Sequence, residues 1–120
     1  MEQSVIAGQS GAYNLDVKTP LLQIISAMPE FPVPKIEYAG YSLLFNEPYT
    51  MCVRKKGDHL YHENKHLDML VYGKDHDELA ETFFDVFCSM WENYARAEDS
   101  KLSKKALGIK KYLLGLAKEV

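Results

Sequence analysis

The sequence predicts a single α+β domain: an antiparallel sheet of three or four strands, then a long packing helix and a C-terminal helix, with a short helix near the N-terminus. Three observations carry this prediction. Strand-like segments separated by turn residues fill the chain from Lys35 to Tyr72. Apolar residues then recur every three or four positions, first from Leu79 to Tyr94 and again from Leu102 to Val120. Strands that precede the helices, instead of alternating with them, indicate an antiparallel sheet covered on one side.

Length and composition fit one ordinary globular domain. The chain has 120 residues, of which 47% are hydrophobic and 26% charged. A core of this size needs neither a disulfide nor a metal to be viable. The net charge of −3 argues against sequence-independent binding to nucleic acid, which relies on clustered Lys and Arg. We therefore expect no nucleic-acid partner and no cofactor.

The N-terminal part is expected to be an arm followed by a short helix. Residues 1–18 are small and polar and predict a flexible arm, so the domain itself would span 19–120. Thr19-Pro20 is typical of a helix start, with Thr as the N-cap and Pro at the first helical position. An apolar stripe follows, made of Leu21, Leu22, Ile24, Ile25 and Met28. Because proline cannot donate to the helical ladder, the helix should end at Pro29, Pro32 and Pro34.

Neither a membrane segment nor a secretion signal is expected. No apolar run approaches the ~20 residues that cross a bilayer. The N-terminus also lacks the basic start and continuous apolar stretch of a signal peptide. These features predict a cytoplasmic protein, in which Cys52 and Cys88 are buried free thiols.

The first predicted strand runs from Lys35 to Phe45 and ends at a turn, Asn46-Glu47-Pro48. The second, Tyr49 to Lys55, alternates, so Tyr49, Met51 and Val53 should share one face. Lys56-Gly57-Asp58 predicts a hairpin, because Gly can adopt a positive φ.

Residues 59–72 form either one long strand or two pieces. In the second half, alternation divides the side chains between two faces. One face would carry Leu67, Met69 and Val71, and the other Asp68, Leu70 and Tyr72.

Both C-terminal helices have start signals. Asp75 and Glu78 form a capping box, in which Glu78 can reach back to the amide of Asp75. The long helix after it has an apolar stripe of Leu79, Phe83, Val86, Phe87, Met90 and Tyr94. Ser103 caps the last helix, whose apolar face is Leu102, Ala106, Ile109, Leu113, Leu116 and Val120.

One motif suggests zinc chemistry. His62-Glu63-Asn64-Lys65-His66 is an H-E-x-x-H string, which on a helix places two imidazoles one turn apart and a Glu as general base. Glu81 is the candidate third ligand, since Glu81 and Asp85 have the E-x-x-x-D spacing of gluzincin metallopeptidases. The surrounding residues predict turn and strand, however, and in a strand His62 and His66 would be ~13 Å apart. A zinc hydrolase that uses His62, His66 and Glu81 is therefore kept only as an alternative, and no catalytic residue is assigned.

The tyrosines are the candidate interface residues. Tyrosine offers a large contact area at low entropic cost and is enriched at protein interfaces. Those expected to gather on the sheet and take this role are Tyr38, Tyr41, Tyr49 and Tyr72. An aromatic pocket between sheet and helix would instead indicate a small-ligand carrier, the second alternative.

The segment Leu67–Gly73 and the residues Lys74 to Leu79 after it resemble HicB-type proteins, in which a strand ends in Gly and an acidic residue starts a helix packed on an antiparallel sheet. The resemblance covers roughly residues 35–97. It implies a ribonuclease-H-like sheet without a catalytic centre, in a protein that binds a small toxin ribonuclease. This chain departs from the family in lacking an appended operator-binding segment and in having extra helices at both ends.

We therefore expect a non-enzymatic protein–protein interaction module that forms a homodimer or binds another small protein. The physical reason is that an exposed sheet edge invites pairing with another chain.

Overall fold

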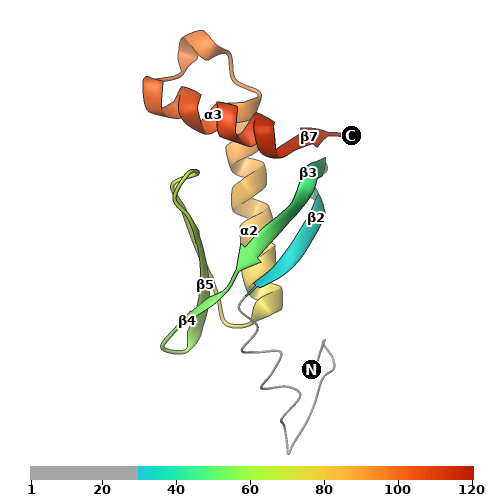
Figure 1. The fold of residues 1–120 in the computed structure, drawn as a ribbon, viewed down its shortest axis with the longest axis vertical. Coiled ribbons are helices and arrows are strands. Elements are labelled where there is room, and N and C mark those ends of the chain that lie inside the picture. Colours follow the sequence, from blue (N-terminus) through green and yellow to red (C-terminus); the bar gives the residue numbers. More distant parts are fainter. Residues whose placement is uncertain (1–29) are drawn as a thin grey trace, which may run out of the picture.

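The computed structural model describes residues 30–120, which form two small antiparallel sheets beside a long helix (Figure 1). The arm predicted at 1–18 and the helix predicted at 19–28 lie outside the described residues. Pro32 and Pro34, which were expected to end that helix, instead lie within a strand.

The first sheet has the order β2-β3-β7 and is antiparallel throughout. Its strands are β2 (Glu30–Tyr38), β3 (Tyr41–Cys52) and β7 (Ala117–Glu119). The chain reverses between β2 and β3 at Ala39 and Gly40, whose φ angles are +51° and +87°. Two consecutive positive φ angles match the right-handed twist of a hairpin. The strand predicted from Lys35 to Phe45 is therefore two strands.

The predicted turn at Asn46-Glu47-Pro48 is a bulge within β3. Val33 of β2 pairs with Tyr49 and Lys35 pairs with Leu44, so Pro34 alone faces four residues of β3. Proline lacks the N–H that a regular ladder needs, and it is tolerated at bulges and on edge strands. The turn-forming residues thus form a bulge in the strand and do not reverse the chain.

The second sheet has the order β4-β5-β6. Its strands are β4 (Arg54–Lys56), β5 (His59–Asn64) and β6 (Met69–Gly73), and only Val53 separates β3 from β4. Gly57, with φ +59°, makes the predicted hairpin. A turn at 65–68 divides residues 59–72 into two pieces. The α+β class and the antiparallel pairing are as predicted, but the strands form two three-stranded sheets.

The long helix is capped by a side chain at its N-terminus and continues into a second helical segment at its C-terminus. α2 (His76–Met90) continues into a π-helical turn, η1 (Trp91–Ala95). The Asp75 carboxylate accepts a hydrogen bond from the Glu78 amide at 2.8 Å, which confirms the N-cap. Glu78 reaches back to the amide of Lys74, at 2.6 Å, one residue earlier than predicted.

The last helix is shorter than predicted. After the 3-10 turn η2 (Asp99–Lys101), α3 (Lys104–Leu116) is capped by Ser103 as expected. It ends at Leu116, and the chain then pairs with β3 as β7. Val120, predicted on the apolar helix face, is instead 68% exposed.

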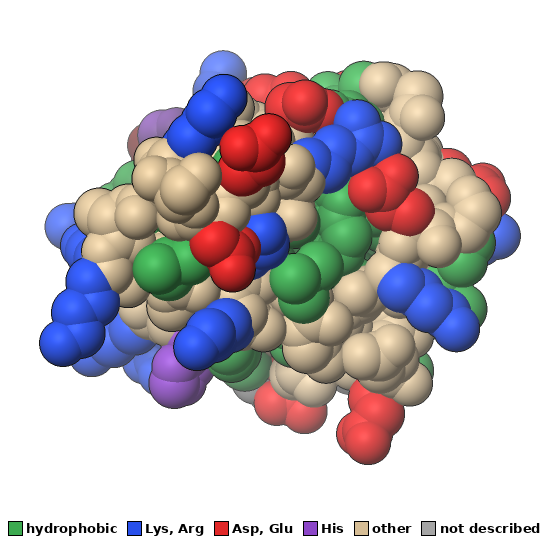
Figure 2. Space-filling view, turned by 90° about the horizontal axis from the view of Figure 1, so that it is seen from above, with side chains coloured by type: hydrophobic (Ala, Val, Ile, Leu, Met, Phe, Trp, Pro, Cys, Tyr) green, Lys and Arg blue, Asp and Glu red, His purple; other side chains and the backbone are tan. Residues whose placement is uncertain are grey.

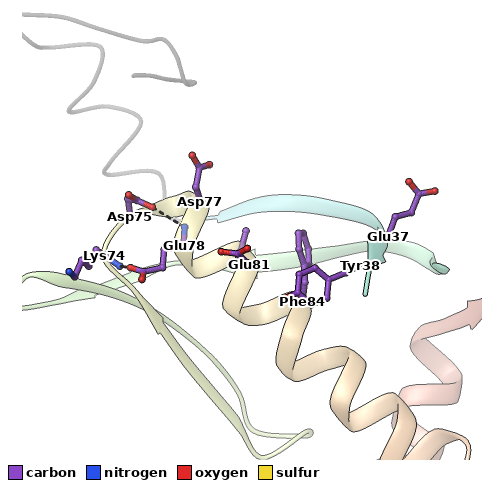
Figure 3. A pocket seen from close by; sticks show the side chains of 9 residues that line it. Glu37, Tyr38, Lys74, Asp75, Asp77, Glu78, Glu81 and Phe84 are labelled. Carbon is purple, nitrogen blue, oxygen red and sulfur yellow. Dashed lines mark hydrogen bonds between the residues drawn. The ribbon is translucent and has the colours of Figure 1, made fainter. Parts of the chain in front are cut away.

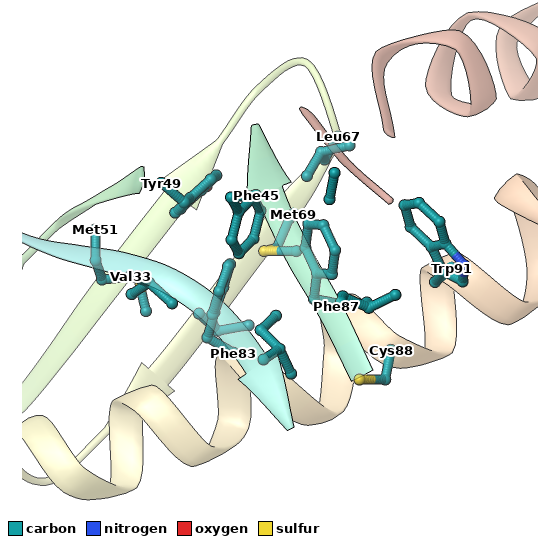
Figure 4. Packing of buried hydrophobic residues seen from close by; sticks show 14 of the residues in the cluster. Val33, Phe45, Tyr49, Met51, Leu67, Met69, Phe83, Phe87, Cys88 and Trp91 are labelled. Carbon is teal, nitrogen blue, oxygen red and sulfur yellow. The ribbon is translucent and has the colours of Figure 1, made fainter. Parts of the chain in front are cut away.

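The core lies where α2 packs on both sheets, with β5 on one side of the helix and β2–β3 on the other (Figure 1). Four rings meet at its centre, and Figure 4 shows them pointing toward one another: Phe45, Tyr49, Phe83 and Phe87. Their successive centroids are 4.9–5.6 Å apart, within the range of favourable aromatic pairs.

The alternation predicted for the strands is confirmed. Tyr49, Met51 and Val53 are buried, as are Leu67, Met69 and Val71. Cys88 is buried as predicted, but Cys52 is exposed because it falls on the outer phase of β3. Among residues 30–120, no helix is long and apolar enough to span a bilayer.

Candidate functional site

The H-E-x-x-H string lies on β5 and the turn after it, so its two imidazoles have different surroundings. His62 points inward from β5 and is 3% exposed. Its Nδ1 is 2.9 Å from the Cys52 carbonyl oxygen, and its Nε2 is 2.7 Å from the Tyr49 hydroxyl. Both ring nitrogens are thus occupied by protein groups.

The hydrogen bonds around His62 form a chain with one consistent direction. A carbonyl can only accept, so His62 Nδ1–H donates to Cys52, and Nε2 accepts from the Tyr49 hydroxyl. Asn64 Nδ2 donates to the same hydroxyl oxygen at 2.9 Å. Asn64 Oδ1 in turn accepts from the Leu67 amide in the turn. Each polar atom has a partner, which is what a buried network requires.

Burial keeps this network neutral. Loss of hydration disfavours the charged form of each group. It lowers the pKa of His62 below its ordinary value and raises the pKa of Tyr49 to about 12. This neutral His–Tyr–Asn network stabilises the fold and leaves no free imidazole nitrogen on His62 for a metal.

The three predicted zinc ligands are not brought together. His66 is exposed, and its ring stacks on Tyr112 with centroids 4.8 Å apart. Glu81 lies on the exposed side of α2. Nowhere in the described range 30–120 do three His, Cys, Asp or Glu side chains converge as a metal site would require.

Three of the four predicted interface tyrosines are buried or half-buried in their own chain. Tyr49 is buried, and Tyr38 packs on Phe84 with centroids 6.2 Å apart. The Tyr41 hydroxyl donates to Glu92 at 2.5 Å, and the Arg96 guanidinium lies over the Tyr41 ring. Their rings are largely engaged within the fold.

Tyr72 is the most exposed tyrosine among residues 30–120, with 43% of its surface exposed. It lies on the outer face of β6, where the Tyr61 ring of β5 is its neighbour at 5.9 Å. Leu70, on the same face of the same strand, is 51% exposed.

A separate acidic hollow of about 840 Å³ lies between β2 and the first half of α2. Figure 3 shows Glu37 from the strand and Asp77 and Glu81 from the helix around it, with Tyr38 and Phe84 on its floor. Asp75 and Glu78 at its rim are hydrogen-bonded to backbone amides. Both of these carboxylates therefore serve to cap the start of α2.

The edges of the two sheets differ sharply in how they are protected. Natural proteins discourage pairing at exposed edges with proline, bulges and charged side chains. β2 has Pro32, Pro34 and the bulge opposite it, and β7 has Lys118 and Glu119. β4 consists entirely of exposed basic residues, Arg54, Lys55 and Lys56.

β6 has none of these protections. Its sequence, Met-Leu-Val-Tyr-Gly, contains no charge and no proline, and its pairing with β5 is regular. Within the described part of the chain, β5 is its only strand neighbour. We call this free side of Met69–Gly73 the β6 edge.

Apolar side chains lie on both faces next to the β6 edge. The outer face carries Leu70 and Tyr72. On the inner side, a hollow of about 410 Å³ opens between β6, α2 and α3, and its apolar lining includes Met69, Val86, Met90 and Ile109. On the face seen from the α3 end, by contrast with the β6 edge, hydrophobic side chains form small patches between acidic and basic ones (Figure 2).

Leu70 was not among the predicted site residues, although the sequence contained a signal for it. The alternation of residues 67–72 had placed Leu70 on one face with Asp68 and Tyr72. What the sequence lacked was the information that β6 is an edge strand, which depends on the pairing of the whole sheet.

Comparison with known proteins adds no family assignment to this geometry. No protein-family model, no curated protein and no solved structure matches the chain.

Proposed function

We propose that this protein is a non-enzymatic binding module that receives an extended segment of another polypeptide at the β6 edge. The observation that carries the proposal is the contrast among the described edges. Three are protected by proline or charge, whereas β6 is uncharged, regular and bordered by exposed Leu70 and Tyr72.

Strand addition would satisfy groups that β6 leaves free. In an antiparallel pair, alternate residues direct their N–H and C=O groups away from their neighbour. An incoming strand pairs with these groups, while side-chain contacts on the two faces select the partner. Here the outer contacts would be made with Leu70 and Tyr72, and the inner ones in the hollow beside Met69 and Met90.

The alternative functions have less support from the geometry. A zinc hydrolase needs free imidazole nitrogens, but His62 uses both of its nitrogens within the fold. A carrier needs space between the aromatic residues, but Phe45, Tyr49, Phe83 and Phe87 pack directly on one another. The resemblance to HicB-type proteins stays a prediction, and it suggests a small toxin ribonuclease as one class of partner.

Site-specific photo-crosslinking in the source cells tests this proposal. The photoreactive residue p-benzoylphenylalanine replaces Tyr72 in one variant and Leu114 in a matched control. Leu114 is on α3 and, at 49%, is as exposed as Leu70. We expect covalent adducts to another polypeptide chain from position 72 and none from position 114. Absence of any adduct at position 72 would refute the proposed function.

A further inference from the structure

We infer that the polypeptide bound at the β6 edge is β6 of a second copy of this chain, antiparallel and related by a two-fold axis through Val71. This inference rests on the proposed function and names its partner. The evidence is the order of side chains along the strand.

Self-pairing centred on Val71 matches apolar residues on both faces. In an antiparallel register, residue numbers across the axis add up to the same total. Val71 therefore faces Val71 of the second copy, and Leu70 faces Tyr72. Because a two-fold axis repeats each contact, two Leu–Tyr pairs form on the outer face. Aromatic–aliphatic pairs directly opposite one another stabilise a sheet.

The charges that flank β6 also match in this register. Asp68 precedes the strand and Lys74 follows it. Both side chains are exposed, and the Asp68 carboxylate is paired with Lys105 of α3 in its own chain at 3.1 Å. Centring on Val71 sets Asp68 across from Lys74 of the second copy, again twice. The sequence Asp68, Leu70, Tyr72, Lys74 is thus complementary to its own reverse, and the charge pairs form when Asp68 exchanges Lys105 of its own chain for Lys74 of the second copy.

The β4 and β2 edges lack this self-complementarity. A second copy of β4 would bring Arg54, Lys55 and Lys56 against an identical basic strand, and like charges directly opposite are destabilising. β2 presents Pro32 and Pro34, which cannot donate to a ladder. Of these three edges, β6 is the one in which self-pairing sets apolar side chains across from one another, at Leu70, Val71 and Tyr72.

The inner hollow supports the same position for the second copy. Its apolar lining from Val86 and Met90 of α2 opens beside Met69, at the edge where the second strand would arrive. Pairing would join the two three-stranded sheets into one six-stranded sheet. It would also reduce the solvent exposure of this lining. The strands are short, so the buried area is below the ~800 Å² per partner of a standard interface, and we expect a dissociation constant of about 1–100 µM.

Sedimentation equilibrium of the full chain from about 5 to 300 µM provides the first test. We expect a reversible dimer that Leu70→Glu weakens at least about tenfold, because a carboxylate then faces Tyr72 twice in each dimer. Leu114→Glu, a matched leucine on α3, should leave the dimerisation unchanged. A chain that stays monomeric throughout, or a dimer that Leu70→Glu does not weaken, would overturn the inference.

Cysteine crosslinking tests the register. In a Cys52→Ser background, the double variant Leu70→Cys/Tyr72→Cys places two pairs of thiols at directly opposed positions, where a disulfide can form. Leu70→Cys alone places its thiols on a diagonal about 7–8 Å apart and should oxidise far more slowly. Equal rates of dimer crosslinking in the two variants would contradict pairing centred on Val71.

Charge exchange gives an independent rescue test. In a Lys105→Ala background, which removes the partner of Asp68 within its own chain, Asp68→Lys and Lys74→Glu should each weaken the dimer by about fivefold. The double exchange should restore the dimer, because the facing charges become opposite again. Circular dichroism checks the fold of each variant, since Asp68 has a φ of +53° that favours small polar residues. Failure of the double exchange to recover the dimer would contradict the charge pairing.

The outcomes for this inference and for the proposed function can be told apart. Adducts from position 72 that join only other proteins, together with a monomeric chain in solution, would overturn self-pairing and leave the binding module intact. Absence of any adduct from position 72 would refute both.

Discussion

At the scale of single residues, the polar interior depends on one hydroxyl. Tyr49 donates to His62 and accepts from Asn64 while its ring stacks on Phe83. It therefore joins the aromatic core to the only buried polar residue among those the structure describes. The string that suggested zinc binding is explained by this structural role.

Replacing Tyr49 with Phe should destabilise the protein by about 1–3 kcal/mol, because His62 Nε2 loses its donor and Asn64 loses its acceptor in a buried site. Urea denaturation measures the free energy of unfolding. Tyr72→Phe removes an exposed hydroxyl and should change it by less than about 0.5 kcal/mol. Equal effects of the two substitutions would contradict the network.

Mild acid should also destabilise the fold. Burial lowers the pKa of His62 and His76 in the folded state, so between that value and the ordinary one the unfolded chain binds more protons. Stability is therefore fully present above about pH 6.5 and is lost as the pH falls through the folded-state values. Denaturation from pH 7.5 to 5 measures this slope, which His62→Gln and His76→Gln should each reduce. A slope unchanged in both variants would rule out this origin.

At the scale of elements, the junction of β6 and α2 is the tightest local structure. Gly73 ends the strand directly beneath the first turn of the helix. A Cβ at this position would be 2.3 Å from the Leu79 amide nitrogen and 2.6 Å from its Cα. Backbone atoms cannot move aside as a flexible side chain can, so glycine is required here for space.

Gly73→Ala should therefore lower the free energy of unfolding by about 3 kcal/mol through overpacking. Gly115→Ala is the control, because a Cβ there has no neighbour within 4 Å and alanine favours the helix. Thermal melts of the two variants should move in opposite directions. A tolerated Gly73→Ala would mean that strand and helix can separate at little cost.

At the scale of the whole molecule, the C-terminal strand connects the second half of the fold to the first. Glu119 on β7 accepts hydrogen bonds from Trp91 Nε1 at 2.9 Å and from Arg96 at 2.7 Å. Its strand pairs with Leu43, Leu44 and Phe45 of β3. The π-helical turn, the last strand and the centre of the first sheet are thereby joined.

Removing residues 117–120 should loosen this connection. We expect faster amide hydrogen exchange at Leu43–Phe45 and a lower melting temperature, because β3 loses its neighbour and Trp91 its acceptor. Val120→Ala alters only an exposed side chain and should change neither. If exchange at β3 were unaffected by the deletion, β7 would have no structural role.

Features that depend on neighbours along the chain could be predicted from the residues alone. Alternation correctly assigned the buried and exposed sides of the second half of β3 and of β6, since neighbouring side chains of a strand point to opposite faces. The N-caps at Asp75 and Ser103 were found because a cap is a contact with an amide three residues away. For the candidate site, this local information placed Leu70 and Tyr72 on one face.

Features that depend on pairing between distant segments could not be predicted in this way. The bulge at Asn46–Pro48 exists because β2 continues past it, and Ala117–Glu119 is a strand because β3 offers a free edge. Which edge of each sheet stays open is likewise settled by non-local hydrogen bonds, and these leave no periodicity in the sequence. The exposed Leu70 and Tyr72 therefore became a candidate interaction site only once β6 was seen at the end of its sheet.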